Sequence, residues 1–189
     1  MNTMDKDYLT GLYTRQALYV LYQGMEKGSF FDFIFLDLDN FKNVNDVYGH
    51  NTGDLVLKTI AKILTENAPD AYAIRLGGDE FVLLFKGIHS KESLCSIAQN
   101  IIDNISNKSY FLDINVYLSA SIGLLYHETV TESLDSILAK SDMAMYYAKT
   151  HGKSQFIVFN DIAQSVFSEI EMEKSQQSSF DQNEFEIRY

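Results

Sequence analysis

Between residues 71 and 85 the chain reads AYAIRLGGDEFVLLF. Two short strand-like runs, 71–76 and 80–85, are separated there by Gly77-Gly78-Asp79. A pair of glycines supplies the positive φ that tight hairpin turns require. The pattern therefore predicts two antiparallel strands joined at an acidic tip.

A second strand-like stretch, residues 31–38, reads FDFIFLDL and is followed by Asp39. Nearly continuous apolar residues are typical of a strand buried on both faces. If the hairpin lies beside this strand, Asp37 and Asp39 meet Asp79 and Glu80, and packed like charges destabilise a fold unless a cation neutralises them. Oxygen ligands without His or Cys favour magnesium or manganese over zinc. Spacing alone leaves a second interpretation open, in which these acids merely cap strand ends.

Helical spacing of apolar residues predicts the other elements. Thr14 is the expected N-cap of a first helix that Gly28 closes, and Pro69 ends a later one. The further predictions are helices near 40–47, 55–64, 94–105 and 134–150, one or two strands within 110–126, and a short strand at 155–159. Such alternation predicts a sheet covered by helices.

The first turn of the helix near residue 40 presents the backbone N–H groups of Asn40, Phe41 and Lys42, a position suited to phosphate oxygens. Lys149 and Lys153 lie four residues apart at the end of the last helix. Lysines also favour helix C-termini because of the helix dipole, so these two residues alone do not predict a phosphate site.

Composition limits the classes of partner. The chain has 189 residues, close to one domain, and its 15 basic and 26 acidic residues give a net charge of −11. This charge disfavours nucleic acid and direct membrane contact. Cys95 is the only cysteine, which indicates a reducing, cytoplasmic setting. Beyond Asp161 the composition becomes polar, so we expect the core domain to span 1–160 and a connector to begin at 161.

The residues Gly77-Gly78-Asp79-Glu80-Phe81 resemble the signature of the GGDEF domains, the diguanylate cyclases. The similarity extends to DYLTGLYTR at 7–15, to DLDNFK at 37–42 with the polar positions that follow, and to residues 142–153. It covers about residues 5–160 in the family's order.

The resemblance implies an α+β fold with a ferredoxin-like, palm-type core, in which helices cover a central, mostly antiparallel sheet. It also implies the conversion of two GTP into cyclic di-GMP and pyrophosphate by a homodimer with two Mg²⁺ or Mn²⁺ ions. The residues carried over by position are Asp37, Asp79 and the Leu38 carbonyl for metal, Lys42, Asp79 and Glu80 for catalysis, Asn45 and Asp54 for guanine, and Lys149 and Lys153 for the triphosphate. Asn45 and Asp54 flank a turn, where such residues also collect for local reasons.

Three features depart from the family pattern or extend it. Lys153 replaces an arginine, which keeps the charge but loses the bidentate fork. The family's inhibitory RxxD motif falls on Ala68-Pro69-Asp70-Ala71, so we expect no product inhibition there. Residues 183–189, NEFEIRY, resemble the start of an EAL phosphodiesterase domain. The alternative function is therefore a GTP-binding module that regulates an attached EAL domain; a polymerase-like palm is disfavoured by the charge.

Overall fold

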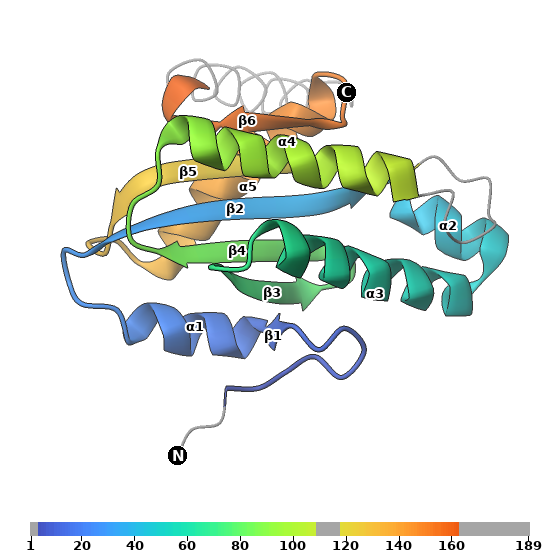
Figure 1. Ribbon diagram of the computed structural model, residues 1–189, viewed down its shortest axis with the longest axis horizontal. Helices are drawn as coiled ribbons and strands as arrows, with labels where there is room; N and C mark the ends of the chain where they lie inside the picture. Colours follow the sequence, from blue (N-terminus) through green and yellow to red (C-terminus); the bar gives the residue numbers. More distant parts are fainter. Residues whose placement is uncertain (1–3, 109–117, 163–189) are drawn as a thin grey trace, which may run out of the picture.

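The computed structural model describes residues 4–108 and 118–162 (Figure 1). Its strands are β1 (Tyr13–Thr14), β2 (Phe30–Asp39), β3 (Tyr72–Gly77), β4 (Glu80–Lys86), β5 (Ser119–Thr129) and β6 (Gln155–Val158). Its helices are α1 (Arg15–Gln23), α2 (Phe41–Tyr48), α3 (His50–Asn67), α4 (Lys91–Lys108) and α5 (Leu134–Thr150). The predicted hairpin is confirmed as β3 and β4, and the strand expected at 31–38 as β2.

The strands form one six-stranded sheet in the order β1-β3-β4-β2-β5-β6. β2 lies in its centre and pairs antiparallel with both β4 and β5, and β3 pairs antiparallel with β4. The two edge strands, β1 and β6, pair parallel with their neighbours. This arrangement confirms the predicted α+β class with a mostly antiparallel sheet.

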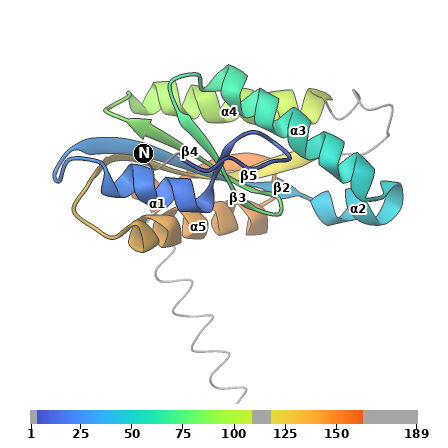
Figure 2. The same ribbon diagram turned by 90° about the horizontal axis from the view of Figure 1, so that it is seen from below.

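Alternation along β2 divides the core into two layers. Ile34, Leu36 and Leu38 pack with residues of α3 and α4 on one face of the sheet. Phe33 and Phe35 pack with residues of α1 and α5 on the other. Figure 2 shows the two helical layers with the sheet between them. Side chains two residues apart on a strand share a face, so the residues that follow Phe35 at this spacing, Asp37 and Asp39, belong to the α1/α5 side.

Several bounds differ from the sequence prediction: α3 and α4 are longer at both ends than the expected 55–64 and 94–105, and of the stretch 110–126 residues 110–117 lie outside the described part while the rest contains most of β5. The first helix ends at Gln23 rather than near Gly28: after Gly24, its C-cap, the α-helical bonding pattern stops and the N–H of Met25 donates to the carbonyl of Tyr22, three residues back. The two-residue strand β1 was not predicted, since two residues carry no readable alternation. The N-cap was predicted correctly: the Thr14 hydroxyl accepts the N–H of Ala17 at 3.3 Å.

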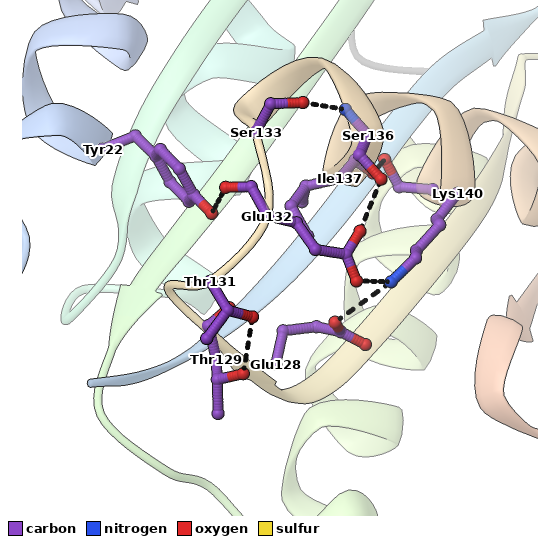
Figure 3. A network of polar contacts seen from close by, with 10 residues as sticks. Tyr22, Glu128, Thr129, Thr131, Glu132, Ser133, Ser136, Ile137 and Lys140 are labelled. Carbon is purple, nitrogen blue, oxygen red and sulfur yellow. Dashed lines mark hydrogen bonds and ion pairs between the residues drawn. The ribbon is translucent and has the colours of Figure 1, made fainter. Parts of the chain in front are cut away.

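A polar network fastens α1 to the start of α5 (Figure 3). The hydroxyl of Tyr22 donates to the Glu132 carbonyl at 3.0 Å, and Lys140 lies 2.6 Å from the carboxylate of Glu132 and 3.6 Å from that of Glu128. Since these groups link α1 with β5 and α5, they fix the spacing of the two helices that cover this face.

The part of the chain that the structure describes contains no helix long and apolar enough to cross a membrane. The segment resembling an EAL start, 183–189, and all but the first two residues of the connector expected from 161 lie outside the described residues.

Candidate active site

The two acidic stretches meet at one end of the central strand. In the β2–β4 ladder Asp37 stands opposite Glu80, and directly opposed residues have Cβ atoms about 5 Å apart on the same face. The N–H of Leu38 donates to the carbonyl of Asp79 at 3.3 Å, which draws the hairpin turn against the strand end. The antiparallel register thus gathers three carboxylates, from Asp37, Asp79 and Glu80, into a small volume.

Asp37 is the most perturbed of these acids. Its side chain is only 11% exposed, and its Oδ1 lies 2.7 Å from Nζ of Lys149. Lys149 is the single partner of Oδ1 among the described residues: the contact is an ion pair outside ideal hydrogen-bond geometry, and no other donor reaches this buried atom. Burial raises the pKa of Asp37 to about 6, helped by the charges of Asp79 and Glu80, while Lys149 opposes the rise.

These residues fit a divalent cation whose coordination is completed by other ligands. Within the described ranges no three His, Cys, Asp or Glu side chains are placed to hold a metal by themselves. Two carboxylates, Asp37 and Asp79, remain as hard oxygen ligands, and Mg²⁺ is commonly bound by one or two carboxylates together with substrate phosphates. The buried, under-bonded Oδ1 of Asp37 is the observation that supports a cation here.

Asp39, in contrast, has both carboxyl oxygens occupied by the protein. It is 2% exposed, and its carboxyl group accepts hydrogen bonds from the hydroxyls of Ser119 and Ser121 on β5 at 2.6 and 2.8 Å. It also accepts the backbone N–H of Ser154 at 3.1 Å. The four acids considered from the sequence therefore separate into three that converge and one that is fully occupied elsewhere.

The residues expected to contact phosphates lie beside the acids. Asn40 adopts a left-handed conformation with φ of 63°, and α2 starts immediately after it with Phe41. The ammonium of Lys153 donates to the side-chain oxygen of Asn40 at 3.1 Å, although 113 residues separate the two. Phe41 is buried, whereas Lys42 is exposed. The structure thus places Lys149 at the carboxylates and Lys153 at the start of α2.

The proposed guanine-reading pair is brought together by a close approach between α2 and α3. A Cβ built on Gly53 would lie 2.0 Å from Oδ1 of Asn45, so the amide of Asn45 occupies the space that any larger residue would need. Asp54 follows Gly53 directly and is exposed, and Asn45 is half-buried. An amide and a carboxylate on these neighbouring helices can bind one purine edge, the amide by donating or accepting a hydrogen bond and the carboxylate by accepting one.

A hollow of about 270 Å³ adjoins the carboxylates on the α1/α5 side. It is lined by Arg15, Phe35, Leu76, Glu80, Leu138, Ala139 and Asp142. Burial raises the pKa of Glu80, and the charges of Asp142 and Asp79 add to that rise. The sequence prediction gave no role to Arg15 or Asp142; their only signal was that each falls within a stretch resembling the family.

Arg75 is a further residue to which the sequence prediction gave no role. Its Nε and Nη2 donate to the carbonyl of Gly78 at 3.1 and 2.8 Å, and its Nη1 lies 3.1 Å from Oδ1 of Asp7. The Asp7 carboxylate also accepts the N–H and hydroxyl of Thr10. One guanidinium thus joins the hairpin turn to the loop that precedes β1.

Comparison with known proteins agrees with this geometry. Residues 4–155 match the family model described as "Diguanylate cyclase, GGDEF domain". The chain is 35% identical over 160 residues to the bifunctional diguanylate cyclase/cyclic di-GMP phosphodiesterase MucR of Pseudomonas aeruginosa, covering 81% of this chain and 23% of MucR. It is 35% identical over 146 residues to diguanylate cyclase A of Treponema denticola, covering 74% of this chain and 38% of that protein. The chain thus spans well under half the length of these curated relatives.

The fold is also similar to a solved structure. The crystal structure of the GGDEF domain of DgcB from Caulobacter crescentus, in complex with c-di-GMP, matches with a TM-score of 0.72 and 26% identity. That match covers 85% of this chain and 98% of the DgcB chain. The family model matches most of the chain, the fold is shared, and the carboxylates of Asp37, Asp79 and Glu80 converge at the end of β2. The chain therefore belongs to the GGDEF family of diguanylate cyclase domains.

Proposed function

We propose that this chain is a diguanylate cyclase that joins two GTP molecules into cyclic di-GMP. Each 3′ oxygen attacks the α-phosphorus of the other nucleotide, and two phosphodiester bonds form while two bonds to pyrophosphate break. Each hydroxyl loses its proton, and two pyrophosphates leave. No covalent bond to the protein is required, so the chain's task is positioning and charge stabilisation.

The GGDEF family depends generally on divalent metal. Two Mg²⁺ or Mn²⁺ ions at Asp37, Asp79 and the Leu38 carbonyl would supply positive charge at the α-phosphate and at the leaving pyrophosphate. The protein's own cations extend this field: Lys149 and Lys153 contact the triphosphate, and Lys42 stabilises charge in the transition state. Backbone N–H groups of Asn40 and Phe41 bind phosphate oxygens at the start of α2.

Two further groups complete the half-site, by which we mean the part of the active site that one chain supplies for one GTP. Asn45 and Asp54 hydrogen-bond the edge of guanine, which rejects bases lacking the matching groups. Glu80 completes the negative cluster at the hairpin and faces the hollow that Arg15 and Asp142 line.

The single observation that carries the proposal is the state of Asp37. A carboxylate that is buried beside other acids, with one ammonium group as its partner, has a raised pKa, so its charged form is disfavoured in the metal-free chain. A cation bound at this point would stabilise the charged form of Asp37. The unfavourable placement of the carboxylate is therefore what a metal-binding site would require.

One half-site holds one GTP, so the two reacting nucleotides must come from two copies of the chain that face each other. Turnover per chain should therefore rise with protein concentration until the dimer is saturated. A rate per chain that is constant across concentrations at which the protein is monomeric would contradict this arrangement.

The test is to incubate a concentrated sample with GTP and Mg²⁺ and to measure pyrophosphate and cyclic dinucleotide. The control is Asp79→Asn, which keeps the backbone carbonyl that Leu38 needs and should lose turnover while retaining the fold. Uptake of GTP with neither product formed would favour the alternative of a regulatory GTP-binding module. Wild-type turnover in Asp79→Asn would remove that residue from the mechanism.

A further inference from the structure

Asp39 joins three parts of the chain that are distant in sequence. It is the last residue of β2, and its carboxyl group binds the two serine hydroxyls of β5 and the backbone of Ser154. The serines at 119 and 121 are themselves 1% and 0% exposed. A buried carboxyl group with every contact directed at the protein is a fixed anchor, in contrast to the under-bonded Asp37 nearby.

The loop that Asp39 holds has an unfavourable conformation. Gly152, Lys153 and Ser154 have φ of 123°, 61° and 49°, so two successive residues with side chains lie in the left-handed region. Residues with a Cβ avoid this region, and such backbone persists only where surrounding contacts impose it. Two contacts do so here: Lys153 N–H donates to the Ala148 carbonyl at 3.0 Å, and Ser154 N–H donates to Asp39.

This conformation has a consequence for Lys153. The side chain of Lys153 crosses to α2 and donates to the neutral side-chain oxygen of Asn40. Among the described residues no carboxylate pairs with it, so its charge is left for a ligand. Lys149 differs, because it is already neutralised by Asp37. The left-handed loop is therefore what presents an uncompensated ammonium group at the start of α2.

We propose that Asp39 is a positioning residue for the triphosphate: by holding Ser154 in its left-handed conformation it fixes Lys153 beside Asn40, ready for phosphate oxygens. The inference rests on the proposed binding of GTP. Asp39 acts through Ser154 and Lys153 and contacts neither nucleotide nor metal, although it lies two residues from Asp37. Its contribution is to remove the conformational freedom that a long side chain on an exposed loop would otherwise lose on binding.

The experiment measures binding of GTP and of guanosine by calorimetry in Mg²⁺. Asp39→Ala should weaken GTP about fivefold to tenfold, the range expected when one charged side chain must be ordered on binding, and leave guanosine affinity unchanged. Asp39→Asn should stay near wild type, because its amide oxygen can still accept from Ser154 and Ser119 while its amide nitrogen donates to Ser121.

Coupling to Lys153 distinguishes positioning from general loosening. Lys153→Met should cause a similar loss, and Asp39→Ala in that background should add little, since residues that act as a unit are not additive. If the buried serine hydroxyls left behind by Asp39→Ala prevent folding, the triple variant Asp39→Ala with Ser119→Ala and Ser121→Ala removes the unpaired groups and takes its place.

Each outcome has a distinct meaning. Equal GTP affinity in Asp39→Ala and wild type, or full additivity with Lys153→Met, would overturn the positioning role while leaving the proposed function intact. A complete loss of Mg²⁺-dependent binding in Asp39→Asn would instead identify Asp39 as a metal ligand and refute the inference. A wild-type chain that binds no GTP would refute both proposals together.

Discussion

Replacing Asp37 by asparagine should stabilise the metal-free protein at neutral pH while abolishing its proposed activity. Asparagine keeps the shape of the side chain and an oxygen that Lys149 can donate to, but carries no charge. The folded-state pKa of Asp37 is about 6, against 3.8 for an ordinary aspartate. One unit of pKa corresponds to about 1.4 kcal/mol, so the ionised carboxylate costs the folded state up to about 3 kcal/mol.

The free energy of unfolding depends on pH because the folded and unfolded chains bind different numbers of protons at Asp37. From pH about 4 to about 6 the unfolded chain has released the Asp37 proton and the folded chain still holds it. Asp37 therefore contributes its full stabilisation to the wild type below about pH 4, while it is protonated, and this contribution is lost as the pH rises to about 6. The amide that Asp37→Asn introduces does not titrate. The difference in unfolding free energy between variant and wild type should grow from near zero at pH 4 to at most about 3 kcal/mol at pH 8.

The assay is urea unfolding of both proteins between pH 4 and 8 in the presence of a chelator. Asp46→Asn, which removes an exposed carboxylate from α2, is the matched control and should show no such pH-dependent gain. Saturating Mg²⁺ should raise the stability of the wild type and leave Asp37→Asn unchanged. A variant that is less stable than wild type at pH 8, or a difference that is equal at pH 4 and pH 8, would refute the reasoning.

The remaining predictions concern the guanine pair, the Arg75 bridge and product control. Gly53→Ala should reduce the ratio of GTP to ATP affinity about tenfold or more, because the new methyl displaces the Asn45 amide; an unchanged ratio would contradict the pair. Arg75→Met should lower the unfolding free energy by about 1–3 kcal/mol at pH 7 in thermal melts. That loss should shrink in acid as the lowered pKa of Asp7 is crossed, since the stabilising charge is present only above it; a pH-independent loss would exclude the ion pair. Cyclic di-GMP should not inhibit turnover through residues 68–71, and tight binding abolished by mutating that segment would overturn this expectation.

Sequence patterns predicted what depends on local periodicity and on strand register. The apolar run of β2 and the glycine pair of the hairpin predicted the strands themselves; whether the hairpin lies beside β2, and so brings Asp79 to Asp37, was left open by spacing and is answered by the β2–β4 pairing. The helix expected near 134–150 is confirmed as α5; the structure adds that Ser133 caps its start.

Contacts between distant segments could not be predicted in the same way. Asp39 finds its serines 80 and 82 residues further along the chain, and the spacing of two residues places it on the same face of β2 as Asp37. The family resemblance assigned a metal role to Asp37 alone, but that Asp39 is an anchor follows only from the pairing of β2 with β5 and from the loop conformation at Ser154. The bridge through Arg75 depends likewise on the approach of the loop before β1, which no spacing rule encodes.

The central position of β2 limits how activity could be controlled. Backbone amides in this strand are bonded to neighbours on both sides, so they should be among the slowest to exchange with deuterium. Moving Asp37 would require breaking strand hydrogen bonds on both sides of β2. If two copies must meet for turnover, a signal can change the activity more easily by changing how the two copies associate than by changing the interior of either copy.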